Sequence, residues 1–132
     1  MTDTVREYSD FIARYPDEEL PDGAESCSAV VCLAVPGTPV IYVSAAFEAH
    51  TGYSAEEAIG RSLSFLQGPE TEPAAIARFR ELIETQSAGS VSVTNYRRDG
   101  SRFQHVCELR PVHGNDGRVS HFVAVQRPAA RR

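Results

Sequence analysis

The sequence predicts a small α+β domain in which one antiparallel sheet carries helices over one face. Its 132 residues, 42% of them hydrophobic, fit a single domain with an ordinary apolar core. Five short runs rich in β-branched residues indicate strands, and helical periodicity is confined to segments before the first run and between the second and third. Short turns join the last three runs, so these strands are expected to be antiparallel.

The first 27 residues are expected to form an N-terminal helix and a linker. Apolar residues recur at helical spacing over residues 2–15, and Pro16 ends the pattern. The stretch "PDEELPDGAES" that follows is acidic and is broken by two prolines and a glycine, as in a linker. We therefore place the domain itself at 28–127 and a short basic tail at 128–132. The apolar stripe of the helix consists of Val5, Tyr8, Phe11 and Ile12.

A hairpin opens the domain, because the apolar runs "AVVCLAV" and "PVIYVS" are separated by Pro-Gly-Thr at 36–38. Ser54 and Glu57 form a capping box that starts a short helix. The best helix is "TEPAAIARFRELIE", with Thr71 or Glu72 as its cap and an apolar stripe on one side. The remaining strands are "SVSVTNYRR", "RFQHVCELR" and "RVSHFVAVQ".

Alternation along the last three strands places polar side chains on the face that should point inward. A three-residue loop at 99–101 keeps both apolar faces of its hairpin in phase and sets Asn95 directly opposite His105. An amide and an imidazole on an inner face either bond each other and nearby backbone or line a pocket for a polar ligand. The pattern leaves both interpretations open. Gln126, on the inner face of the last strand, is a third candidate.

The outer face of the last strand is also predicted to be apolar, since it carries Val119, Val123 and Val125, with Val106 on the neighbouring strand. An exposed sheet face of this kind needs a cover. The stripe of the N-terminal helix can supply that cover, within one chain or from a second copy. We therefore expect a homodimer that uses these residues.

Composition excludes several classes of function. A net charge of −5 argues against a nucleic-acid or anionic-membrane partner, and no apolar run is long enough to span a membrane. Three cysteines without CxxC spacing, and no signal peptide, predict a cytoplasmic protein. His105 and Cys107 are too few ligands for a metal site. No nucleophile–base pairing is present, so we do not expect an enzyme.

Three stretches carry a family pattern in the right order and at the right distances: "IYVSAAFEAHTGYSAEEAIGRSLSFLQGPETEP", "NYRRDGSRF" and "HFVAVQ". They closely resemble the LOV (light-oxygen-voltage) subclass of PAS domains, over about residues 29–126. The resemblance implies a PAS-like five-stranded antiparallel sheet with helices on its inner face and a flavin, usually FMN, between them. In family members, blue light makes a cysteine add to the flavin ring.

Four positions keep the residues that the family uses to hold flavin. Asn95 matches an asparagine that bonds the pyrimidine-like edge of the ring, where an amide suits both N–H and carbonyl groups. Gln126 matches the glutamine that senses the ring near N5 and O4. Gln67 and Arg80 match an amide and an arginine that bind the ribityl-phosphate tail.

Four other positions depart from the family. Leu63 stands where the reactive cysteine should be, and a leucine methyl cannot add to the ring, so the adduct photocycle is excluded at this position. Ser62 replaces an asparagine, and Ser64 replaces an arginine that would pair with the phosphate. His105 replaces the second asparagine, and it can donate one hydrogen bond but lacks the donor-plus-acceptor fork of an amide.

Two functions remain. The first, which the four retained residues favour, is a cysteine-less LOV-like sensor that binds FMN or riboflavin and responds by photoreduction or redox change. Since only six residues follow Gln126, we expect the signal to leave through altered association with a separate signalling protein. The alternative, which the four departures favour, is a flavin-free PAS module for dimerisation or protein interaction.

Overall fold

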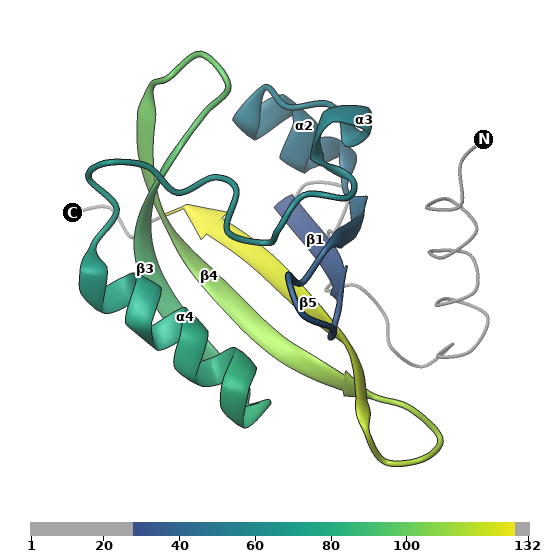
Figure 1. Cartoon of the computed structure of the whole chain (residues 1–132). Coiled ribbons are helices and arrows are strands. Elements are labelled where there is room, and N and C mark those ends of the chain that lie inside the picture. Colours follow the sequence, from purple (N-terminus) through teal and green to yellow (C-terminus); the bar gives the residue numbers. More distant parts are fainter. Residues whose placement is uncertain (1–27, 129–132) are drawn as a thin grey trace.

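The computed structural model describes residues 28–128, which form one five-stranded antiparallel sheet with helices packed on one face (Figure 1). The strand order is β2-β1-β5-β4-β3. This is the predicted α+β fold. The predicted N-terminal helix, with Val5, Tyr8, Phe11 and Ile12, lies outside the described residues. The elements are β1 Ser28–Leu33, β2 Val40–Val43, α2 Ala45–Thr51, α3 Ala55–Ala58, α4 Pro73–Thr85, β3 Gly89–Tyr96, β4 Arg102–His113 and β5 Val119–Pro128.

The sheet carries an apolar cluster on each face. The larger cluster lies between the sheet and the helices, where Phe47, Leu82 and Phe122 are almost fully buried. Burial of such side chains supplies roughly 1.5–3 kcal/mol each and holds the helices on the sheet. The smaller cluster lies on the outer face and consists of Val31, Ile41, Val112, Val123 and Val125.

The helix ends follow the predicted caps only in part. The predicted capping box is present, because Ser54 and Glu57 satisfy each other's backbone N–H groups at the start of α3. At α4 the capping residue is Glu72, but its side chain makes no cap bond. Its carboxylate instead accepts hydrogen bonds from the backbone N–H and the hydroxyl of Thr94, at 2.8 and 2.7 Å. The start of α4 is therefore fixed to β3 rather than capped by its own residue.

The β3–β4 hairpin differs from the predicted register by two residues. Asn95 pairs with Phe103 and not with His105. The loop has three residues, as predicted, but they are residues 98–100. Gly100 has a φ of 89°, and its backbone N–H closes the preceding turn. In such a loop the left-handed residue comes last, whereas the prediction put the glycine in the middle. A shift of two keeps every side chain on its predicted face.

Val119 is a second correction, because it packs in the larger cluster beneath the helices and not on the outer face. The cause is a β-bulge near the start of β5. Val112 pairs with His121 and His113 pairs with Val119, so Ser120 is an extra residue on one strand. One extra residue inverts the alternation of side chains on either side of it.

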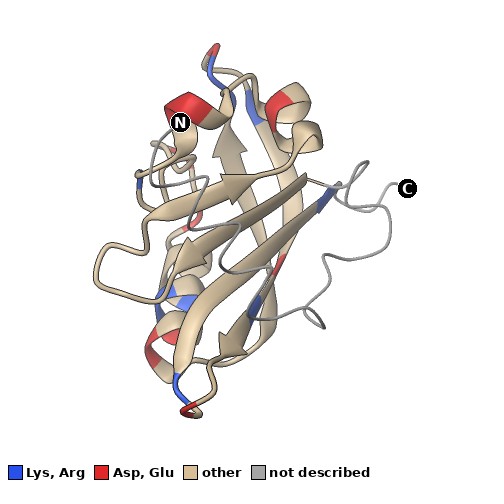
Figure 2. Ribbon diagram, turned by 90° about the vertical axis from the view of Figure 1, so that its right-hand side faces the viewer, with Lys and Arg blue, Asp and Glu red and all other residues tan. Residues whose placement is uncertain are grey.

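Charged residues lie mainly on helices, turns and strand ends, and few lie along the strands (Figure 2). Several form surface pairs, such as Arg98 with Glu57 and Arg127 with Glu108. Exposed pairs of this kind stabilise a fold only weakly. Within residues 28–128, no helix is long and apolar enough to cross a membrane.

Candidate functional site

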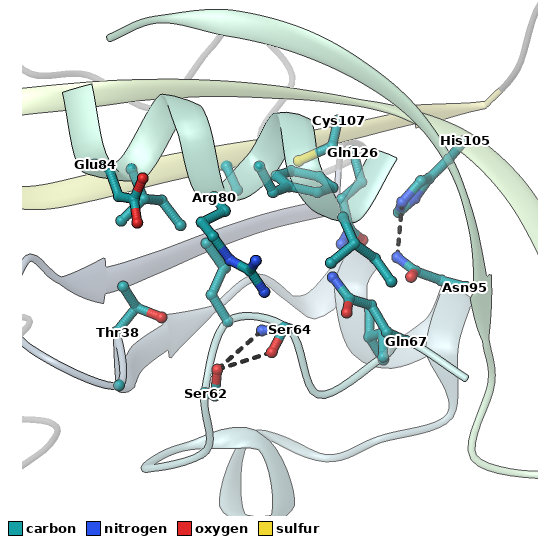
Figure 3. Close-up of a pocket in the computed structure, with 17 residues that line it drawn as sticks. Thr38, Ser62, Ser64, Gln67, Arg80, Glu84, Asn95, His105, Cys107 and Gln126 are labelled. Atoms are coloured by element: carbon teal, nitrogen blue, oxygen red, sulfur yellow. Dashed lines mark hydrogen bonds between the residues drawn. The ribbon is translucent and has the colours of Figure 1, made fainter. Parts of the chain in front are cut away.

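A cavity of about 440 Å³ lies between α4, the segment before α4 and the inner face of the sheet. Its volume is in the range that small-molecule sites usually have. All the residues predicted to bind the ligand line this cavity, although they come from five parts of the chain: the segment before α4, α4, β3, β4 and β5 (Figure 3). These residues are Leu63, Gln67, Arg80, Asn95, His105 and Gln126.

Asn95 and His105 bond each other at one end of the cavity. Nδ2 of Asn95 lies 2.9 Å from Nε2 of His105 (Figure 3). An amide nitrogen can only donate, so Nε2 accepts and the imidazole proton lies on Nδ1. Oδ1 of Asn95 and Nδ1 of His105 are buried without a hydrogen-bond partner. The pair thus leaves one acceptor and one donor unsatisfied beside the cavity.

His105 is held in its neutral form. Only 1% of the residue is exposed, and burial lowers the pKa of its imidazole to about 4, with a smaller contribution from the charge of His50. The ring of Phe103 lies edge-on between the two, at 4.6 Å from His50 and 5.0 Å from His105. A neutral imidazole leaves Nε2 unprotonated, as the hydrogen bond donated by Asn95 requires, and keeps the N–H donor on Nδ1.

Gln126 reaches the cavity from β5, and its orientation is fixed by Ser28 on the adjacent strand. The Ser28 hydroxyl donates to Oε1 of Gln126 at 2.7 Å. Because the amide oxygen is engaged, the Nε2 donor is the part of Gln126 left for another partner. No hydrogen bond joins this Nε2 to another described residue.

The segment that carries Leu63 is held along β2. Val40 exchanges backbone hydrogen bonds with Gly60 and Arg61, and the N–H of Leu63 donates to the carbonyl of Thr38 at 3.0 Å. Leu63 is half-buried and packs against the larger apolar cluster. It is therefore both a core contact and part of the cavity wall, and it offers no reactive group there.

Residues 28–127 match the family of PAS domains. The chain belongs to the PAS domain family. It is 41% identical over 91 residues to a blue-light-activated histidine kinase of Rhizobium johnstonii, covering 69% of this chain and 26% of the kinase. It is 42% identical over 99 residues to Protein TWIN LOV 1 of Arabidopsis thaliana, covering 74% and 25%. The chain thus spans about a quarter of the length of each of these relatives.

Solved structures place this PAS domain beside LOV domains. The light state of the Aureochrome1 LOV domain superposes with a TM-score of 0.75 at 31% identity, covering 86% of this chain and 91% of that one. A light-oxygen-voltage domain studied with a flavin analogue superposes with a TM-score of 0.76 at 30% identity, covering 96% and 89%. The homologues and structural neighbours of the PAS domain thus include LOV-type blue-light sensory proteins.

The other end of the cavity in this PAS domain is formed by hydroxyls and two charges. Ser62 and Ser64 bond each other through their hydroxyls at 3.0 Å. Arg80 and Glu84, both exposed on α4, line the cavity, and the sequence analysis missed Glu84. Its position four residues after Arg80, on the same side of a helix, was the available signal.

Two cysteines of the PAS domain are buried as free thiols. Cys107 lines the cavity from β4, and Cys32 lies in the apolar cluster on β1. Burial raises the pKa of each thiol to about 12. Both thiols are therefore poor nucleophiles near neutral pH. Over residues 28–128, no group of three side chains is arranged to hold a metal ion.

Proposed function

We propose that this PAS domain is a LOV-like sensor that binds a flavin in the cavity between α4 and the sheet. The observation that carries the proposal is the Asn95–His105 pair, with one unpartnered acceptor and one unpartnered donor beside the cavity. An unsatisfied buried polar atom costs about 1–3 kcal/mol. A ligand that satisfies both atoms would recover this cost.

The pyrimidine-like edge of a flavin offers the complementary groups, because an N–H stands next to a carbonyl oxygen. Oδ1 of Asn95 can accept from the N–H, and Nδ1–H of His105 can donate to the carbonyl. The histidine thus supplies, together with Asn95, the acceptor and donor that two amides would supply. The residues present therefore fit the ring edge despite the replacement of an asparagine by His105.

Gln126 and Gln67 complete the polar set around the proposed ligand. With its oxygen held by Ser28, Gln126 presents its Nε2 donor, which suits an acceptor atom of the ring. A bound flavin would supply light absorption and reversible reduction. Gln126 would be sensitive to a change at that atom, because its Nε2 can only donate and its Oε1, which could accept, is held by the Ser28 hydroxyl.

We infer that the response does not use a cysteine adduct. Leu63 occupies the position of the family's reactive thiol, and the thiol of Cys107, although it lines the cavity, has a pKa of about 12. Photoreduction or a redox change is then the input. The output is altered association, either in a homodimer or with a separate signalling protein. Val123 and Val125 of the outer sheet face are almost fully buried within the single chain, so that face would have to be uncovered to take part.

The purified protein tests the proposal through its visible spectrum before and after addition of flavin. We expect a flavin band in the blue with resolved vibronic structure, either as purified or after incubation with FMN or riboflavin. Asn95→Ala should weaken flavin binding about tenfold or more, because it removes the buried amide that bonds His105 and would accept a hydrogen bond from the ring. A colourless protein that takes up neither flavin would refute flavin binding.

The second candidate is a flavin-free interaction module, and the Asn95–His105 bond favours it, because the two side chains already partly satisfy each other. The same spectrum separates the two candidates. A colourless protein whose mass in solution falls from dimer to monomer on Val123→Arg would support the interaction module. Val123 is buried in the outer cluster, so circular dichroism must show that the variant is folded.

A further inference from the structure

The end of the cavity opposite the Asn95–His105 pair indicates which form of the ligand fits. In Figure 3 Glu84 and Thr38 lie at one end of the cavity, His105 and Asn95 lie at the other, and Arg80 lies between them. A ring bound by the Asn95–His105 pair would extend its tail toward Glu84.

We propose that this end selects a flavin with an uncharged polyol tail, riboflavin, over a flavin that ends in phosphate, FMN. This inference rests on the proposed function, because it assumes that a flavin is the ligand. It adds that the tail is recognised by hydroxyl groups and that a phosphate dianion is disfavoured.

The charges at this end do not suit a dianion. Among the described residues that line the cavity, Arg80 and Glu84 are the charged side chains, and they cancel. A phosphate monoester carries about −1.5 to −2 charges at neutral pH. Strong phosphate sites supply several charged or backbone donors, often an arginine in bidentate contact. Here one arginine is offset by a carboxylate, in a chain whose net charge is −5.

The direction of α4 also disfavours a phosphate at this end of the cavity. α4 runs from Pro73 to Thr85, so Arg80 and Glu84 lie in its last two turns. The carboxyl end of a helix carries partial negative charge, whereas anions bind at the amino end. The amino end of α4 lies away from the cavity, because residues 73–75 are not part of its lining.

The uncharged groups suit a polyol. The hydroxyls of Ser62 and Ser64 lie 3.0 Å apart in the cavity wall, and Thr38 adds a third hydroxyl to the lining. Hydroxyls both donate and accept, as the hydroxyls of a ribityl chain do. Gln67 and Arg80 offer further donors along the cavity. The ribityl hydroxyls are therefore matched mainly by hydroxyl and amide groups.

Titration of the flavin-free protein with riboflavin and with FMN, followed by quenching of flavin fluorescence, tests the proposal. We expect riboflavin to bind about tenfold more tightly than FMN at low salt, and added salt to narrow the difference by screening. Glu84→Gln should strengthen FMN binding severalfold and change riboflavin binding much less, because the substitution removes a charge that acts mainly on the phosphate. Ser64→Arg should strengthen FMN binding about 10- to 100-fold, because it adds a charge-assisted bond.

Glu81→Gln is the matched control, since Glu81 is an exposed acid on the same helix, paired with Arg78 and outside the cavity lining. It removes the same charge from the chain and should change neither affinity. FMN binding as tight as riboflavin in the unaltered protein would overturn the tail preference and leave flavin binding intact. Failure of both flavins to bind would overturn the proposed function, and the preference with it.

Discussion

The ring of Tyr96 covers Gly68 so closely that a Cβ at residue 68 would lie 2.4 Å from two of its ring carbons. The contact is reinforced by the Tyr96 backbone N–H, which donates to the carbonyl of Leu66, and by the Tyr96 hydroxyl, which accepts from the N–H of Glu70. These contacts fix the segment that carries Gln67 against β3. The glycine in "FLQGPE" is thus a requirement of packing.

Gly68→Ala should lower the free energy of unfolding by about 1–3 kcal/mol, because the methyl group forces the ring or the segment to move. Chemical denaturation measures this change. In a Tyr96→Leu background the obstructing ring is absent, and the same alanine should cost much less. Equal costs in the two backgrounds would show that the ring is not the obstacle, since residues in contact are expected to couple.

Stability should fall as the pH is lowered from about 6.5 toward 4, because burial lowers the pKa of His105 to about 4. The unfolded chain binds a proton on this histidine near pH 6.5, whereas the folded chain resists it. Its contribution to folding is therefore complete well above pH 6.5, and about 2 kcal/mol of it is lost by pH 5.

Urea denaturation from pH 7 to 5 measures this dependence above the range where the carboxylates titrate. His105→Asn should remove most of the slope. The pKa of His50 is also lowered, first by burial and then by the charge of Arg97, so His50→Gln should remove a smaller part. A slope that persists in His105→Asn would place the proton on another group.

The thiols of Cys32 and Cys107 should be unreactive in the folded protein, since burial raises the pKa of both to about 12. In a Cys27→Ser variant, an aromatic disulfide reagent should release no thiol chromophore at pH 8 within minutes. Two equivalents should appear after unfolding in urea. Rapid reaction of one equivalent under native conditions would show that a thiol is reachable from solvent, and Cys107→Ser would identify which.

Leu63→Cys should give the flavin-loaded protein a new light response. Leu63 lines the cavity. The resemblance of the sequence to LOV domains implies that the reactive thiol belongs at this position, so blue light should bleach the flavin band and darkness should restore it. Absorption spectra before and after illumination measure this. Leu63→Ser, similar in size and without a thiol, should not bleach in this way. An identical response in both variants would argue against an adduct at residue 63.

Much of the fold could be predicted from the sequence because its strongest signals are local. The hairpin of β1 and β2 followed from a Pro-Gly-Thr turn between apolar runs, and the capping box of Ser54 and Glu57 followed from two residues three apart. The inward positions of Asn95 and His105 needed only the two-residue period and an odd loop.

The incorrect predictions arose where a single residue changes the strand register or the alternation of side chains. The sequence gives no separate signal for the bulge at Ser120, so alternation put Val119 on the wrong face. The position of Gly100 in its loop, last and not central, moved the register by two residues. Glu84 was missed because an exposed acid on a helix usually faces water, and only the tertiary fold shows that it borders a cavity.

Ser28 and Gln126, 98 positions apart, are paired across adjacent strands and joined by a hydrogen bond. The first and last strands of the described fold therefore bring its two ends close together. A unit of this kind can be inserted within another protein with little disturbance to either, because its two junctions are close together. A segment fused after β5 follows Pro128, two residues beyond Gln126, which lines the cavity, and a segment fused before β1 ends next to Ser28, which is hydrogen-bonded to Gln126.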